Sequence, residues 1–216
     1  MSCDCVIQYL EKIDAPILIK DRHTILELDE ENVYVLKEGI IKVSMILDDN
    51  REFNITYLKG TDVVSFFSEG LLETTTAHIR IRIESEIACF YYVSREVFTK
   101  QVKQDSNLRS YVNSYYRNQL KNAIYRQQLM IMNSKTGAVC AFIYRTISLF
   151  GKKTQNGILI NLQITNEDIA SFCGISTRNS VNRIIRSLKE KHVIQIVNNK
   201  IVVLDPDYLK QFTERG

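Results

Sequence analysis

The stretch TNEDIASFCGISTRNSVNRIIRSLKEKHVIQIVNNKIVVL, residues 165–204, decides how the C-terminal part of the chain folds. It opens with Thr165, followed three residues later by Asp168, which is a pattern typical of a capping box at the start of a helix. This short helix is predicted to end near Phe172. Gly174 lies just beyond that point and indicates a turn, which is expected over 173–176.

A second helix is predicted over 178–190, and its pattern separates a buried face from an exposed one. Four apolar residues stand at the spacing i, i+3, i+4 and i+7: Val181, Ile184, Ile185 and Leu188. They form one stripe along the helix, and this stripe must be buried. The outward face then carries Arg178, Asn179, Asn182, Arg183, Arg186 and Lys189. Guanidinium and amide groups suit the edges of guanine and adenine, and cations pair with phosphates.

The two helices and the residues after them make a recognisable supersecondary pattern. A helix, a glycine-containing turn and a second helix with a basic outward face are typical of the helix-turn-helix of DNA-binding proteins. The strand-like runs 193–197 and 201–204 are joined by Asn198-Asn199 and are expected to form a β-hairpin wing. The sequence therefore predicts a winged helix-turn-helix that binds double-stranded DNA.

The residues that contact DNA are predicted from the outward face of the second helix and from its first turn. Arg183 is the strongest candidate for a guanine contact. Arg186 and Lys189 are expected to meet phosphates or only to solubilise the helix. The predicted set is Arg178, Asn179, Ser180, Arg183, Arg186 and Lys189, with Ser176 and Thr177 as helix cap first and phosphate donors second.

The charge of the chain is unevenly distributed. Residues 138–216 hold 11 Lys and Arg against 6 Asp and Glu, a net charge of +5, whereas residues 1–137 hold 17 against 19, a net charge of −2. A basic domain beside a near-neutral one is expected of a protein that meets a polyanion. The alternative, which charge alone favours, is a solvated charged surface.

Residues 17–92 contain short β-branched and aromatic runs separated by turn residues. The predicted strands are 24–28, 32–36, 40–47, 53–58 and 87–93. Gly39, Gly60 and the stretch 48–50 mark turns between them. Many short strands at this spacing predict an antiparallel roll, barrel or sandwich. The predicted fold class is therefore α+β, with an N-terminal antiparallel β-roll, a long helix and a C-terminal winged helix-turn-helix.

A long helix is predicted over 108–132, where apolar residues recur at helical spacing without proline or glycine. A small β domain cannot cover a helix of this length alone, so the helix either packs along the roll or pairs with its twin in a homodimer. The predicted parts are a β-roll domain at 1–99, a dimerisation helix at 100–133, a hinge at 134–137 and a DNA-binding domain at 138–216.

Several classes of protein are excluded by what the sequence lacks. The cysteines at positions 3, 5, 89, 140 and 173 do not have the spacing of a zinc or iron–sulfur site, so they are expected to be free thiols. No glycine-rich phosphate loop and no Ser-His-Asp set is present, so the protein is not expected to be an enzyme. No apolar run approaches the roughly 18 residues of a membrane span, and no signal peptide is evident, so the expected location is the cytoplasm.

The alternative to a DNA-binding regulator is a small-molecule-binding protein whose winged helix is a protein-interaction module. The roll would bind a small molecule, and the winged helix would dock another protein instead of DNA. A protein-docking helix is expected to expose apolar anchors, whereas the outward face of 178–190 is cationic and amide-bearing.

With these motifs the sequence resembles a Crp/Fnr-type transcription regulator over nearly its whole length. The family pattern G-x-S followed by R-E-T-V-x-R corresponds to GIS at 174–176 and RNSVNR at 178–183. Thr177 is one residue more than the family has in this turn. Within the family the sequence is most similar to the PrfA-like subgroup of Listeria virulence regulators. This likeness rests on YLKG at 57–60, NSKTGAVC at 133–140 and SVNRIIRSLK at 180–189.

The resemblance implies a bacterial homodimer on a palindromic promoter site, with RNA polymerase as a further partner if the protein is an activator. No cofactor is required, and a cyclic-nucleotide effector is not expected because 65–82 lacks the family's phosphate-binding cassette. In the PrfA-like subgroup the effector is glutathione. The resemblance places an effector cavity between the two halves at Lys59, Tyr125, Lys135 and Tyr144; a turn lysine and tyrosine packing are the alternative for these residues.

Overall fold

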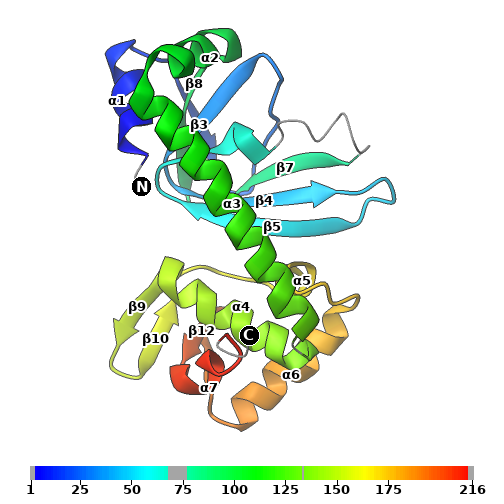
Figure 1. Ribbon diagram of the computed structural model, residues 1–216. Coiled ribbons are helices and arrows are strands. Elements are labelled where there is room, and N and C mark those ends of the chain that lie inside the picture. The colour runs from blue at the N-terminus through cyan, green and yellow to red at the C-terminus, as the bar shows by residue number, and fades with distance from the viewer. Residues whose placement is uncertain (1–2, 68–76, 133, 214–216) are drawn as a thin grey trace. The chain divides into compact units, whose positions relative to one another are not determined.

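The computed structural model describes residues 3–67, 77–132 and 134–213. The chain divides into two compact units, Met1–Leu120 and Lys121–Gly216. Helix α3 (Ser106–Met132) belongs to both, because it continues without a break across the division (Figure 1). The division therefore falls inside the long helix and not at the predicted hinge.

The N-terminal unit is built on two antiparallel four-stranded sheets, in the orders β1-β8-β3-β6 and β2-β7-β4-β5. The strands are β1 (Ile17–Asp21), β2 (Ile25–Leu26), β3 (Asn32–Glu38), β4 (Ile40–Ile46), β5 (Glu52–Lys59), β6 (Asp62–Val63), β7 (His78–Ile83) and β8 (Ile87–Ser94). A 3-10 turn, η1 (Val64–Phe67), follows β6. The predicted antiparallel β-roll is confirmed, although β2 is shorter than the predicted strand 24–28.

The core of the roll lies between the two sheets. Leu36 and Phe90 from one sheet pack in the same buried cluster as Ile41, Val43 and Ile81 from the other. These residues meet because alternate side chains of each strand point to the same face. The alternation visible in IIKVSMI at 40–46 thus explains why β4 presents an apolar face to the core.

Three helices accompany the roll: α1 (Asp4–Lys12), α2 (Arg95–Gln104) and α3. A second buried cluster joins Val6 and Leu10 of α1, Phe98 of α2 and Leu108 of α3 with Val33 of β3. The helix α1 was not predicted from the sequence. Its two fully buried residues show that it is part of the core of this unit.

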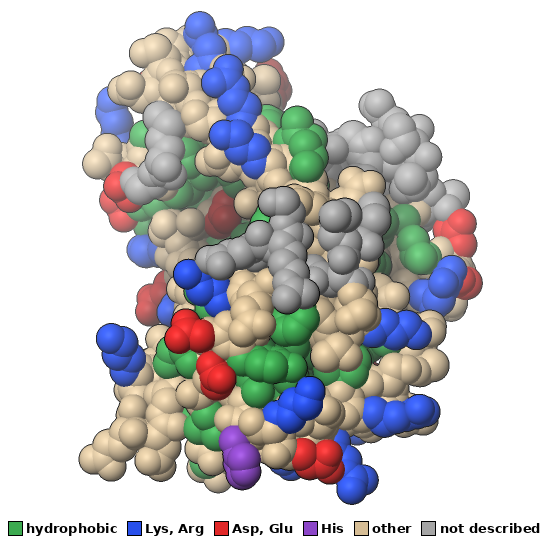
Figure 2. Space-filling model, turned by 60° about the horizontal axis from the view of Figure 1, so that its bottom comes forward, with side chains coloured by type: hydrophobic (Ala, Val, Ile, Leu, Met, Phe, Trp, Pro, Cys, Tyr) green, Lys and Arg blue, Asp and Glu red, His purple; other side chains and the backbone are tan. Residues whose placement is uncertain are grey.

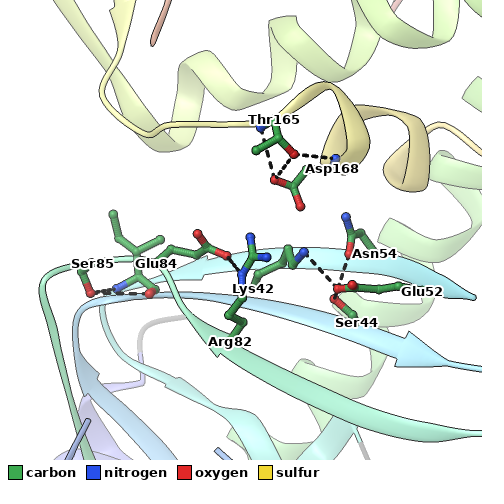
Figure 3. A network of polar contacts seen from close by, with 10 residues as sticks. Lys42, Ser44, Glu52, Asn54, Arg82, Glu84, Ser85, Thr165 and Asp168 are labelled. Atoms are coloured by element: carbon green, nitrogen blue, oxygen red, sulfur yellow. Dashed lines mark hydrogen bonds and ion pairs between the residues drawn. The ribbon is translucent and has the colours of Figure 1, made fainter. Parts of the chain in front are cut away.

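The opposite face of β4, β5 and β7 carries a polar network (Figure 3). Lys42 is only 1% exposed, and its ammonium group lies 2.9 Å from the Glu52 carboxylate. Burial would raise the pKa of Glu52, but hydrogen bonds from Ser44 and Lys42 lower it overall. Arg82 pairs with Glu84 at 2.7 Å. Each buried charge of this network therefore has a partner of opposite sign, which offsets the cost of its burial.

The C-terminal unit contains a helical part and one antiparallel sheet in the order β11-β12-β10-β9. Its elements after α3 are α4 (Lys135–Phe150), β9 (Gly151–Thr154), β10 (Gly157–Ile160), α5 (Asn166–Phe172), α6 (Arg178–Glu190), β11 (Ile194–Val197), β12 (Lys200–Val203) and α7 (Pro206–Lys210). Asn198 and Asn199 have φ values of 49° and 60°, as a tight hairpin turn requires. The predicted winged helix-turn-helix is confirmed.

Helix α4 begins inside the predicted hinge 134–137. The Ser134 hydroxyl caps it by accepting a hydrogen bond from the Gly137 amide, so 135–137 form its first turn. Three of the four residues of the predicted hinge are therefore helical, and Asn133 lies outside the described residues. Within the described ranges, every helix is too short or too polar to cross a membrane.

A glycine at the β3–β4 turn supplies the first testable prediction. Gly39 has φ of +119°, and a Cβ there would stand 2.8 Å from the Ala88 Cβ. Gly39→Ala is expected to lower the free energy of unfolding by more than about 2 kcal/mol, because backbone strain and a steric clash combine. Chemical denaturation followed by circular dichroism measures the change.

Gly60→Ala is the matched control for this measurement. Gly60 also has a positive φ, +77°, but among the described residues no atom lies within 4 Å of the point where a Cβ would stand. Only the strain of about 1–2 kcal/mol is expected there. Equal losses in the two variants would contradict the close approach of Gly39 to β8.

Candidate nucleic-acid interface

The first helix of the motif, α5, is fixed at its N-terminus by a capping box (Figure 3). The Asp168 amide donates to the Thr165 hydroxyl at 3.0 Å, and the Thr165 amide donates to the Asp168 carboxylate at 3.2 Å. Ile169 is fully buried and anchors the helix. The chain then turns at Gly174, whose φ of +62° favours glycine, and enters α6. The capping pattern predicted from the sequence is confirmed.

The second helix, α6, begins at the residue after Thr177. The Thr177 hydroxyl accepts a hydrogen bond from the Ser180 amide and lies 2.8 Å from the Ser180 hydroxyl. Thr177, the additional residue of the turn, is thus the N-cap. Ser176 is exposed one residue earlier and does not occupy the cap position.

The orientation of α6 follows from its apolar stripe. Val181, Ile185 and Leu188 are buried, and Ile184 is half-buried. Of the predicted DNA-contacting residues, Ser180 is half-buried. The others are all exposed: Ser176, Thr177, Arg178, Asn179, Arg183, Arg186 and Lys189. The helix therefore presents a continuous cationic and amide-bearing face.

Two arginines of this face form ion pairs with acidic residues of the helix-turn-helix. Arg178 forms an ion pair with Glu167 of α5 at 2.8 Å, and Arg186 pairs with Glu190 at 2.9 Å. Such exposed ion pairs contribute only about 0–1 kcal/mol, so a phosphate or a base edge can replace the carboxylate. In the described part of the chain Arg183 has no such partner, which leaves its guanidinium group available.

Two residues of this surface were missed by the sequence reasoning. Asn166 donates to the Asn182 side-chain oxygen at 2.6 Å, and Glu167 holds Arg178. Both come from the first turn of α5, 16 and 11 residues before their partners in the sequence. Helical periodicity reports neighbours three or four residues apart, so no local signal pointed to these contacts.

Acidic residues lie among the basic residues of the C-terminal unit. Figure 2 shows Lys and Arg side chains interspersed with Asp and Glu on the face that it brings forward. Residues of both signs line α6 itself, because Glu190 follows the basic run. The positive character of the unit thus comes from an excess of cations rather than from an exclusion of acids.

The four predicted effector residues lie in two different units. Lys59 ends β5 in the N-terminal unit, whereas Tyr125, Lys135 and Tyr144 belong to the C-terminal unit. The Tyr125 hydroxyl donates to the Thr213 carbonyl at 3.2 Å, and Lys135 is exposed at the start of α4. The role of these residues as an effector site stays a prediction.

Two partly buried cations near Tyr125 were not anticipated. The Arg145 guanidinium lies 5.4 Å from the centre of the Tyr125 ring. Burial lowers the pKa of Arg145 and of Arg126, and in Arg126 the neighbouring Arg145 charge adds to the effect. The contact of Arg145 with the ring stabilises this cation at a partly buried position.

Comparisons with known proteins support the architecture. Residues 137–212 match a family model described as the Crp-like helix-turn-helix domain. The chain is 46% identical over 207 residues to the lactate racemization regulatory protein of Lactiplantibacillus plantarum, a match that covers 94% of both chains. The chain belongs to the Crp/Fnr family of transcription regulators. This Crp/Fnr regulator is also 26% identical over 189 residues to the listeriolysin regulatory protein of Listeria monocytogenes, covering 86% of this chain and 78% of that protein.

Solved structures of other regulators share the fold. A CooA variant from Carboxydothermus hydrogenoformans has a TM-score of 0.72 and 19% identity, covering 94% of this chain and 89% of its own. A CRP-family transcriptional regulator from Thermus thermophilus has a TM-score of 0.72 and 16% identity. The match covers 91% of this chain and 96% of that protein's chain. The predicted family, with its likeness to the Listeria regulator, is confirmed.

The cap of α6 gives a second testable prediction. Thr177→Ala removes the oxygen that accepts from the Ser180 amide, so it is expected to lower the free energy of unfolding by about 1 kcal/mol. Ser176→Ala is the control, and its expected change is within about 0.5 kcal/mol. Urea denaturation of both variants measures the difference. An equal loss in the two would contradict the assignment of Thr177 as the cap.

Proposed function

We propose that this Crp/Fnr regulator acts as a homodimer that binds a palindromic promoter site in double-stranded DNA. The observation that carries the proposal is the face of α6, where Arg183 is exposed and unengaged among the described residues above a buried apolar stripe. An arginine in this position suits the bidentate acceptors of guanine in the major groove. Arg186 and Lys189, further along the same face, suit phosphates.

The homodimer is supported by the exposed face of α3. Tyr116, Leu120 and Ile124 are spaced four residues apart and are 41%, 63% and 57% exposed. Residues at this spacing form one stripe along a helix. An apolar stripe on an exposed helix is suited to burial against a second copy, and two-fold pairing is the commonest arrangement of soluble homo-oligomers. Two α6 helices then reach half-sites about one helical turn of DNA apart.

The regulated genes are proposed from similarity. The 46% identity over 94% of both chains to a regulator of lactate racemization favours genes of that process as targets. Purified protein is expected to shift duplexes that cover the promoters of such genes and not duplexes of unrelated promoters. Equal affinity for both sets would contradict this assignment while leaving specific DNA binding intact.

The effector is proposed from the family resemblance. Glutathione is the candidate, with Lys59, Tyr125, Lys135 and Tyr144 as the residues that meet it, and activation would add a contact with RNA polymerase. A ligand changes DNA affinity only if it binds one state of the protein more tightly than another. A titration of promoter DNA with and without reduced glutathione tests this part.

Arg183→Ala tests the direct contact with a base. The variant is expected to lose about 1–3 kcal/mol of affinity for the specific site and to discriminate less at the base it contacts. Lys189→Ala, on the same face, is expected to weaken binding to all duplexes similarly and to reduce the salt dependence by about one unit. Fluorescence anisotropy measures both. Unchanged discrimination in the Arg183 variant would refute its role.

Leu120→Asp tests the dimer. It places a charge in the middle of the apolar stripe, so it is expected to weaken self-association at least about tenfold, because an unpaired charge is costly to bury. Asn122→Asp makes the same change of charge at an exposed position outside the stripe and is the control. Sedimentation equilibrium gives the dissociation constants. A dimer of undiminished affinity in the Leu120 variant would contradict the proposed interface.

A further inference from the structure

The N-terminal unit contains a cavity of about 270 Å³ that none of the predicted site residues lines. It lies between the N-terminal end of α1, the start of β6 and one face of α3. The residues that matter for its chemistry are Cys3, Asp62, Tyr111, Tyr115, Asn118 and Gln119. Its volume is close to the lower end of ligand cavities, which hold about 300–1,000 Å³, so it suits a compact molecule.

Asp62 gives the cavity its charge. Among the described residues that line the cavity it is the only acid, and none of them is lysine, arginine or histidine. One carboxylate oxygen accepts a hydrogen bond from the Val63 amide at 2.8 Å. Burial raises the pKa of Asp62 to about 6, and the bond from Val63 only partly opposes this. At neutral pH the described lining therefore holds a desolvated carboxylate and no cation.

The other titratable groups around Asp62 are neutral at that pH. Burial raises the pKa of the Cys3 thiol to about 11, and it raises the pKa values of the Tyr111 and Tyr115 hydroxyls well above the usual range. The Tyr115 hydroxyl donates to the Val63 carbonyl at 3.2 Å, so its ring is held in place. These groups shape the wall and supply hydrogen bonds without adding charge.

We propose that this cavity binds a small molecule with one protonated amino group, which pairs with the Asp62 carboxylate. A carboxylate or phosphate ligand would meet Asp62 without a compensating cation, and an apolar ligand would leave a buried charge unpaired. The side-chain amides of Asn118 and Gln119 can both donate and accept hydrogen bonds, so they suit further polar atoms of the ligand.

The proposed site is compatible with the homodimer but does not depend on it. Tyr111, Tyr115 and Asn118 are spaced three or four residues apart and share one face of α3. Leu120 and Ile124 of the exposed stripe lie on another face of the same helix. A second copy paired on that stripe would therefore leave the cavity accessible.

The test uses the full-length protein and a panel of small primary amines that each carry one amino group: ethanolamine, 3-aminopropanol and isobutylamine. Ethylene glycol, similar in size to ethanolamine but uncharged, and L-lactate, an anion, are the comparison compounds. Saturation-transfer NMR and calorimetry at pH 7.5 are expected to show binding of at least one amine and of neither comparison compound. Failure of all three amines, or binding of lactate at this site, would overturn the proposal.

Asp62→Asn separates the ion pair from the shape of the cavity. The amine that binds is expected to lose at least tenfold in affinity, whereas Asp49→Asn, at an exposed turn, is expected to leave affinity unchanged. In the unchanged protein, amine affinity is expected to fall about tenfold per unit as pH drops below about 6, because protonation of Asp62 removes the partner. Undiminished affinity in the Asp62→Asn variant, or in the unchanged protein at pH 5, would overturn the proposal.

The stability of the ligand-free protein provides a second readout. The pKa of Asp62 is about 6 in the folded protein and about 3.9 in the unfolded chain. The desolvated carboxylate therefore lowers the free energy of unfolding by its full amount above pH 6, and this effect disappears below about pH 4. Asp62→Asn is therefore expected to raise the melting temperature at pH 7.5 and to leave it unchanged near pH 4. A lower melting temperature at pH 7.5 would show that Asp62 already has a partner and would contradict the proposed site.

Discussion

The burial of three side chains on α6 is the constraint on which the function of this protein depends. Val181, Ile185 and Leu188 can be buried together in only one rotation of the helix, and this rotation sets which residues face outward. The capping box of α5 and the Thr177 cap fix where the two helices begin. Arg183 is exposed as a consequence of apolar packing on the opposite side. The cationic face that we propose reads DNA is thus obtained without any special backbone geometry beyond the turn at Gly174.

Helix α3 has different tasks on its different faces. Leu108, Tyr111 and Tyr115 pack into the N-terminal unit, whereas Leu120 and Ile124 are exposed. The first face closes the cavity around Asp62, and the second is suited to a partner helix. The cavity and the proposed dimer contact thus lie on one helix, which continues into the C-terminal unit. A ligand bound in the cavity would therefore contact the same helix that carries the proposed dimer contact. The ligand can change dimerisation only if it binds the monomer and the dimer with different affinities.

Much of the fold follows from short-range patterns in the sequence, and the rest depends on contacts that such patterns do not encode. The capping residues at 165–168, the stripe of α6 and the Asn198-Asn199 turn are local signals, and each predicted its element. Helix α1 was missed because its nine residues are fewer than the window of about 11–18 residues over which helical periodicity is recognised. The Glu167–Arg178 pair was missed because its members lie 11 residues apart. The desolvation of Asp62 was missed because it comes from distant parts of the chain, including Tyr111 and Tyr115 of α3.

Selection of bound duplexes from a random DNA pool by the purified protein tests the central claim most directly. We expect enrichment of a two-fold symmetric motif whose half-sites are centred about 10–10.5 base pairs apart, or a multiple of that spacing, bound by two chains per duplex. Recovery of no motif at low salt, or of a single asymmetric site bound by one chain, would contradict the claim that the protein reads DNA as a homodimer.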